Sequence, residues 1–229
     1  MLLLAMDTAT PAVTVALYDA DEDRVLAAVE RVDARRHGEL LMPAVDRVLT
    51  SAGRGLAQVD GLVAGTGPGP YTGLRVGLVT AAALGAARSL PVYGVCTLDG
   101  IAFAAGLDEP FVVATDARRK EVYWAGYTDA VTRVEGPAVD KPAEIAGRIA
   151  GRPVVGAGGA LYPDAFPGAR PDLPAYASAG ALAAVAARRL AAGAEPEPPQ
   201  PLYLRRPDAR EPAGYKAVTP PPAEAVARR

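Results

Sequence analysis

A glycine- and proline-rich stretch followed at once by a helical run constrains the fold of this chain more than any other feature. Residues 65–77 read GTGPGPYTGLRVG, and the apolar residues 61–64 precede them. Glycine and proline cannot continue a strand ladder, so the chain must turn here. The pattern predicts a short buried strand, a tight loop and a helix. The loop is either a structural turn, which we favour, or an anion site made by its backbone N–H groups; it lacks the lysine of a phosphate-binding P-loop.

The helix predicted over residues 73–89 is apolar or small on nearly every side. Arg75 and Arg88 are its only charges, and such a helix is buried on more than one face. Gly77, Ala81 and Gly85 recur every fourth residue and form a smooth ridge suited to close packing against another helix. One face can lie on a sheet. We expect the other to be covered by a neighbouring helix or by a second protein.

The first half of the chain follows the order strand, strand, strand, helix, strand, helix, strand, helix. These elements are expected at residues 2–6, 13–18, 25–32, 39–51, 61–64, 73–89, 92–96 and 98–105. The first three strands are joined by short turns, which predicts antiparallel neighbours, and the later strands are added through helical crossovers. This is the ribonuclease-H-like order, an α/β fold with a mixed sheet and helices on its faces.

Residues 107–195 repeat this plan in a smaller, truncated form. The expected elements are strands at 111–115, 121–127, 132–139 and 154–155 and helices at 142–150 and 178–193. The sequence thus predicts two ribonuclease-H-like units, at 1–106 and 107–195. Residues 196–229 contain nine prolines, so we expect disorder there, except that residues 202–205 can dock back in extended form.

Charge and the scarcity of histidine and cysteine exclude several classes of function. A net charge of -2 on 229 residues offers no basic field that would by itself attract nucleic acid. Cys96 and His37 are the only residues of their types, which excludes a thiolate or histidine-rich metal site. Cys96 is best explained as a small buried hydrophobe, and His37 as a polar residue at a helix start. The N-terminus lacks the features of a signal peptide and no apolar run is long enough to span a membrane, so we expect a cytoplasmic protein.

The duplicated plan resembles the superfamily of actin, Hsp70 and sugar kinases. In active members of that superfamily, an Asp-x-Gly-Thr turn holds phosphates and metal between the units. Here the first turn, at residues 7–10, reads DTAT, and the second begins DAR at residue 116; both lack the glycine. We therefore expect no cofactor and only a vestigial nucleotide cleft, at Asp7, Asp116, Gly158 and Gly159. The charged residues 116–121 are either a solvated hairpin or part of a cleft between the units.

Five segments carry a more specific resemblance. They are LAMDTAT at 4–10, RHGELLMP at 36–43, GPGPYTGLRVG at 67–77, DARRKEVY at 116–123 and PLYLR at 201–205. They closely resemble the TsaB (YeaZ) family, non-catalytic partner subunits in bacterial synthesis of N6-threonylcarbamoyladenosine in tRNAs that read ANN codons. The resemblance implies a TsaD-like catalytic partner, a TsaE-like ATPase, a homodimer in isolation, and contact with tRNA only through the assembled complex.

The resemblance also implies where the functional residues lie. TsaD binds its metal through a His-x-x-x-His pair, and the matching positions here are Thr97 and Ile101, which cannot replace histidine ligands. Partner binding is expected on the two helices of the first unit, at Leu41, Val45, Val48, Leu74, Gly77, Leu78, Ala81, Leu84 and Gly85. The alternative is an ATP-dependent transferase of the actin-like superfamily that acts by itself. A peptidase, or a tRNA-binding module acting alone, has little support from the sequence.

Overall fold

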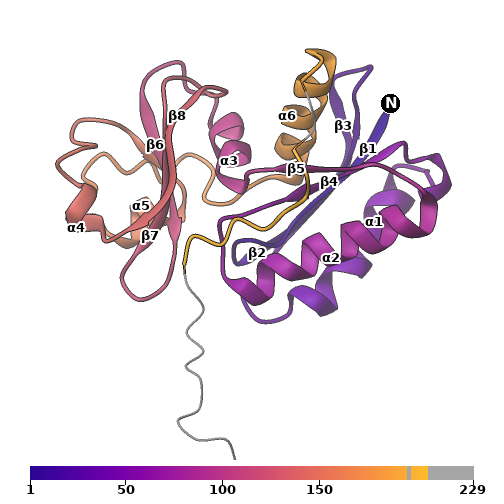
Figure 1. Cartoon of the computed structure of the whole chain (residues 1–229), viewed down its shortest axis with the longest axis horizontal. Coiled ribbons are helices and arrows are strands. Elements are labelled where there is room, and N and C mark those ends of the chain that lie inside the picture. The colour runs from indigo at the N-terminus through magenta and orange to yellow at the C-terminus, as the bar shows by residue number, and fades with distance from the viewer. Residues whose placement is uncertain (195–196, 206–229) are drawn as a thin grey trace, which may run out of the picture.

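The computed structural model describes residues 1–194 and 197–205, and their strands form two mixed sheets (Figure 1). The first sheet has the strand order β3-β2-β1-β4-β5. Its strands are β1 (Leu2–Asp7), β2 (Ala12–Asp19), β3 (Arg24–Val32), β4 (Gly61–Gly65) and β5 (Val92–Val95). β1, β2 and β3 pair antiparallel, whereas β4 is parallel to β1 and β5 is parallel to β4. This confirms the ribonuclease-H-like order.

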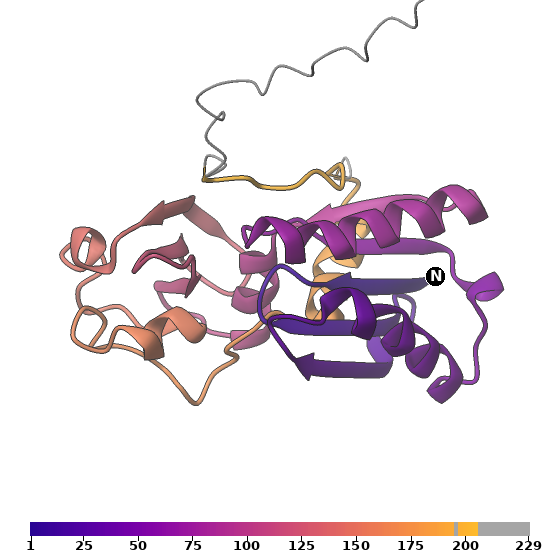
Figure 2. The ribbon, with the colours of Figure 1, turned by 90° about the horizontal axis from the view of Figure 1, so that it is seen from below.

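Both faces of the first sheet are covered, because alternate side chains of a strand point to opposite faces. Leu4 and Met6 of β1 face the core beneath α1 (His37–Ser51) and α2 (Tyr71–Arg88). Leu3 and Ala5 face the opposite core. The 3-10 helix η1 (Leu56–Gln58) connects α1 to β4. Figure 2 shows α1 and α2 running along the first sheet. Among the described residues, no helix has the length and apolar character needed to cross a membrane.

The second sheet is smaller and has the order β8-β7-β6-β9. Its strands are β6 (Phe111–Asp116), β7 (Val122–Tyr127), β8 (Arg133–Asp140) and β9 (Val154–Val155). Two short helices, α4 (Pro142–Ile145) and α5 (Ala157–Leu161), accompany it. The helix expected over 142–150 is wrong in length, since α4 ends at Ile145 and turns follow. Gly147, a poor helix former, lies just beyond that end.

Each sheet is packed against a helix from the other half of the chain. α3 (Thr97–Ala105) follows the first sheet in sequence, but its Leu98 and Ile101 pack with Phe111 and Val113 of the second sheet. α6 (Ala179–Ala191) was expected to complete the unit at 107–195. Instead it lies against the first sheet, where Leu182 joins the core of Leu3 and Ala5 (Figure 1). Neither sheet therefore has a complete core without a helix from the other half of the chain.

Residues 197–205, here called the C-terminal strap, lie in extended form across both units. The backbone N–H of Gly94 donates to the Glu197 carbonyl at 2.8 Å, and the Leu202 N–H donates to the Thr66 carbonyl at 2.8 Å. The strap thus follows the edge of the first sheet before it reaches the second unit (Figure 2). Docking begins before the expected residues 202–205. The rest of the expected disordered segment, residues 196 and 206–229, lies outside the described residues.

Candidate functional site

The first of the two superfamily turns is closed by the chain's own glycine–proline loop. Asp7 is 1% exposed. Its Oδ1 accepts from the Ala9 N–H at 2.9 Å, and its Oδ2 accepts from the Thr97 hydroxyl at 2.6 Å. A Cβ on Gly69 would overlap the Ala9 carbonyl, and one on Gly65 would overlap the Asp7 carboxylate. The loop is therefore a close-packed structural turn, and Asp7 lies inside the protein.

Burial sets the ionisation of Asp7. Desolvation raises its pKa to about 6, against the opposing effect of the hydrogen bonds from Thr97 and Ala9. In the part of the chain that the structure describes, no group of three or more His, Cys, Asp or Glu side chains could hold a metal ion. Asp7 is a buried carboxylate with both oxygens in hydrogen bonds to the chain itself.

The two positions matched to the TsaD histidines both make contacts inside the protein. Besides Asp7, the Thr97 hydroxyl contacts the backbone N–H of Gly67, which donates to it at 3.1 Å. Ile101 is fully buried in the core shared with the second sheet. Their neighbour Cys96 is 1% exposed, and burial raises the pKa of its thiol to about 12, which confirms that it is an inert hydrophobe.

A cavity of about 150 Å³ lies where the N-terminal ends of α1 and α2 meet the second unit. Its lining is more apolar than polar, and the polar side chains in it come from Thr8, Thr10, Arg35, His37, Thr72, Asp116 and Arg118. The Nε2 of His37 lies 2.8 Å from the Thr10 carbonyl, so this nitrogen carries the proton and donates it. His37 therefore ties the start of α1 to the β1–β2 turn, as its position at a helix start suggests.

The structure places only one of the four expected cleft residues in this cavity. Asp116 lines it, whereas Asp7 is sealed beneath the loop. Gly158 and Gly159 lie in α5, where a Cβ on Gly158 would approach the Ala114 carbonyl carbon to 2.8 Å and one on Gly159 would approach the Val154 carbonyl oxygen to 3.1 Å. These glycines serve close packing of α5 on β6 and β9. The four residues expected to form a cleft therefore do not line one common cavity among the described residues.

The turn after β6 is strained and held by the strap. Arg118, Arg119 and Lys120 all have left-handed backbones, with φ of 63°, 53° and 61°, and each such non-glycine residue costs about 1–3 kcal/mol. Arg205 of the strap donates to the Ala117 carbonyl at 2.9 Å and pairs with Glu121. The three cationic residues of the turn are exposed, and Arg118 also lines the cavity.

Eight of the nine positions expected to face a partner are buried in the chain's own core. They are Leu41, Val45, Val48, Leu74, Gly77, Leu78, Ala81 and Gly85; Leu84 is half-buried. The small-residue ridge faces the sheet: the Gly77 N–H donates to the Thr8 hydroxyl at 2.9 Å. A Cβ on Gly85 would meet Val92 at 2.5 Å. Close approach to the sheet, and not to a second helix, explains the ridge.

The opposite side of α2 carries an exposed stripe of apolar and small residues. We call it the outer stripe, and it comprises Val79, Ala82, Ala83 and Ala86. Val79 is 63% exposed, and Met42 on α1 is 46% exposed. The spacing i, i+3, i+4, i+7 places the stripe on one helical face.

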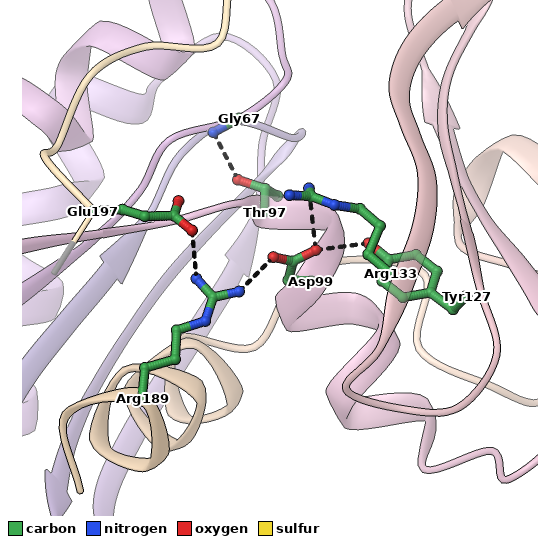
Figure 3. A network of polar contacts seen from close by, with 7 residues as sticks. All are labelled: Gly67, Thr97, Asp99, Tyr127, Arg133, Arg189 and Glu197. Carbon is green, nitrogen blue, oxygen red and sulfur yellow. Dashed lines mark hydrogen bonds and ion pairs between the residues drawn. The ribbon is translucent and has the colours of Figure 1, made fainter. Parts of the chain in front are cut away.

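Sequence reasoning missed a buried ionic centre at Asp99 on α3 (Figure 3). The Asp99 side chain is 9% exposed. It accepts from the Tyr127 hydroxyl at 2.9 Å and from Arg189 of α6 at 2.8 Å, and Arg133 of β8 lies 3.3 Å away. Arg189 also binds Glu197 of the strap at 3.0 Å. No local pattern marks this centre, because the hydrogen-bonding partners lie 28 and 90 residues from Asp99.

Comparison with known proteins supplies a family. The model described as "TsaD: tRNA N6-adenosine threonylcarbamoyltransferase" matches residues 28–173. An uncharacterized protein of Mycobacterium tuberculosis is 45% identical over 212 residues, which is 91% of this chain and 93% of that protein. The "tRNA threonylcarbamoyladenosine biosynthesis protein TsaB" of Escherichia coli is 38% identical over 130 residues, 56% of this chain and 55% of its own length. The solved structure of YeaZ from Pseudomonas aeruginosa matches with a TM-score of 0.75 and 31% identity, covering 89% of this chain and 99% of that one.

Proposed function

Because this chain belongs to the TsaB (YeaZ) family, we propose that it is the non-catalytic partner subunit in the synthesis of N6-threonylcarbamoyladenosine in ANN-decoding tRNAs. In this proposal it works in the cytoplasm with a TsaD-like catalytic subunit and a TsaE-like ATPase. It reaches tRNA within the assembled complex.

The main support for a non-catalytic role is that the turn at residues 7–10 is closed by the glycine–proline loop. The glycine–proline loop packs on Ala9 so tightly that Gly69 has no room for a Cβ, and Asp7 is sealed behind it. A phosphate or metal cannot reach that carboxylate without opening the loop. Thr97 and Ile101 in place of the histidines support the same role.

The outer stripe supports the partner role. It is an exposed apolar helical surface, and its residues are small enough to let another helix approach closely. We propose that α1 and α2 bind the TsaD-like subunit through this outward surface, and that a second copy of the chain occupies it in isolation. In this proposal the buried residues of α1 and α2 hold the helices on the sheet and do not contact the partner directly.

Reconstitution tests the proposal. A TsaD-like subunit, a TsaE-like ATPase, threonylcarbamoyl-adenylate and an ANN-decoding tRNA transcript are combined with and without this chain, and the modified nucleoside is measured by mass spectrometry. We expect product only when the chain and the TsaD-like subunit are both present. Full product formation without the chain would contradict the partner role, and product from the chain alone would contradict its non-catalytic nature.

The alternative, an ATP-dependent transferase acting alone, would have to use the cavity beside Asp116 and Arg118. At about 150 Å³ this cavity is smaller than the roughly 300–1,000 Å³ of usual ligand pockets. We therefore expect no micromolar binding of ATP with Mg²⁺ to the isolated chain by calorimetry. Such binding, lost in Asp116→Asn, would favour the alternative.

A further inference from the structure

Two exposed tyrosines stack at the N-terminal end of α2. The rings of Tyr71 and Tyr203 lie 5.1 Å apart with 27° between their planes, and they are 49% and 42% exposed. The guanidinium of Arg75 lies 3.8 Å from the Tyr71 ring centre. Its Nε donates to the Tyr203 hydroxyl at 3.0 Å. Helix α2 and the strap thus build one solvent-facing stack of planar groups.

The strained cationic turn adjoins this stack. Arg205 follows Tyr203 by two residues and binds the Ala117 carbonyl at 2.9 Å, which places the turn next to the tyrosines. Thr72 of α2 and Arg118 of the turn also line the same cavity. The left-handed backbone of residues 118–120 turns three long cationic side chains toward solvent.

Together these groups form a surface that we call the platform patch. It comprises Tyr71, Arg75, Arg118, Arg119, Lys120, Tyr203 and Arg205. Apart from Arg119, four of these residues are cationic, and among the described residues two carboxylates contact them: Asp116 lies 3.8 Å from Arg118, and Glu121 pairs with Arg205. The patch is therefore locally positive, although the whole chain has a net charge of -2.

We infer that the platform patch binds tRNA, an inference that rests on the proposed function. Unpaired RNA bases stack on aromatic rings and on arginine planes, and phosphates are attracted to clustered lysine and arginine. The exposed rings can stack on RNA bases, and the neighbouring positive charge can attract the phosphates. The outer stripe, which is apolar, is the surface suited to protein. tRNA would thus touch this subunit directly once the complex has formed.

The first test measures binding of a fluorescent ANN-decoding tRNA transcript to the complex of the full chain with its TsaD-like subunit. Tyr203→Ala removes the stack, and we expect affinity to fall about 10-fold. The double variant Arg118→Asn with Lys120→Asn removes charge, while asparagine tolerates the left-handed backbone. For this variant we expect a similar loss and a salt dependence of binding reduced by about one to two phosphate contacts.

Matched variants separate recognition from folding. Arg54→Asn with Arg88→Asn removes two exposed cations at the far ends of α1 and α2, and we expect unchanged affinity. Tyr203→Phe keeps the ring but loses the hydrogen bond to Arg75, and it should bind tRNA within about twofold of wild type because stacking persists. Thermal unfolding of each variant identifies any that fail to fold.

Two outcomes would overturn the inference, and photocrosslinking tests it by a separate measurement. Wild-type tRNA affinity in both the tyrosine and the double variant would overturn it. Loss of the TsaD-like subunit from these variants by analytical ultracentrifugation would also overturn it, because the patch would then be a protein interface. Photocrosslinking of thiouridine-substituted tRNA to the peptides of Tyr71 and Tyr203 is read without any modification reaction. The crosslinking result therefore does not depend on whether the complex modifies the tRNA.

Discussion

The carboxylate of Asp7 shows how burial couples one residue to the stability of the fold. Its pKa rises from 3.8 to about 6 because the folded protein desolvates it. Between these values the folded state binds more protons than the unfolded state, so the contribution of Asp7 to stability falls as the pH rises from about 4 to about 6. Above that window the contribution is constant.

Asp7→Asn should remove this dependence. Each pKa unit corresponds to about 1.4 kcal/mol, so we expect the variant to gain up to about 3 kcal/mol on wild type between pH 4 and pH 7. Urea unfolding of both proteins across that range measures the difference. The same comparison for Asp46→Asn, an exposed carboxylate on α1, serves as the control. A difference for Asp7→Asn that stays constant with pH would contradict the argument.

Gly69→Ala adds one methyl group and tests whether the glycine–proline loop is close-packed against Ala9. The new Cβ would overlap the Ala9 carbonyl, which is backbone and cannot swing aside, so we expect a loss of about 2–4 kcal/mol in unfolding free energy. Gly38→Ala in the first turn of α1 is the matched control. Among the described residues its Cβ meets nothing within 4 Å, and alanine should stabilise the helix by up to about 1 kcal/mol. Equal effects of the two changes would show that the loop is not close-packed.

At the scale of elements, α2 has two apolar sides, of which one is buried against the sheet and the other is exposed. The side with Gly77, Ala81 and Gly85 lets the helix lie close on the sheet, and the outer stripe is exposed. In the proposed function, the same helix joins the core on one side and binds a partner on the other.

Val79→Glu separates these tasks. Val79 is 63% exposed, so we expect the unfolding free energy to change by no more than about 0.5 kcal/mol. Binding of the TsaD-like subunit should weaken by at least about 100-fold, because a docked partner would bury an unpaired charge. Ala81→Glu, on the buried side, should prevent folding. Light scattering and calorimetry give the two readouts, and undiminished partner binding by Val79→Glu would refute the assignment of the outer stripe.

At the scale of the whole molecule, three connections hold the two units together. α3 and α6 each complete the core of the other unit, and the strap crosses both. Asp99 lies where these connections meet, since it binds Tyr127 of β7, Arg189 of α6 and, through Arg189, the strap (Figure 3). The relation between the two sheets is therefore set by a few long-range contacts.

Asp99→Ala should loosen this junction. Removing one partner leaves buried polar groups unpaired, which costs about 3–5 kcal/mol for fully buried ion pairs. Because Arg133 and Arg189 are 27% and 35% exposed, we expect a smaller loss of about 2–3 kcal/mol in unfolding free energy. Asp46→Ala on the exposed side of α1 should change it by less than about 0.5 kcal/mol. A loss for Asp99→Ala no larger than that of the control would mean that Asp99 does not join the units.

The amino-acid sequence by itself determined the elements and their order. Apolar runs, turn residues and the break at the glycine–proline loop are local patterns, and they predicted the strands, the main helices and the ribonuclease-H-like plan. They also predicted the inert Cys96 and, through the resemblance, the family. Each of these features depends on residues that are close together in the chain.

Tertiary structure alone decided which surfaces meet. α2 is apolar or small all the way round, so no periodicity could show that its glycine ridge faces the sheet and its outer stripe faces solvent. The exchange of α3 and α6, the Asp99 centre and the contact of Tyr203 with Tyr71 join residues far apart in sequence. Such pairings depend on the packing of the whole chain, because an apolar face that is buried against one element cannot pack against another.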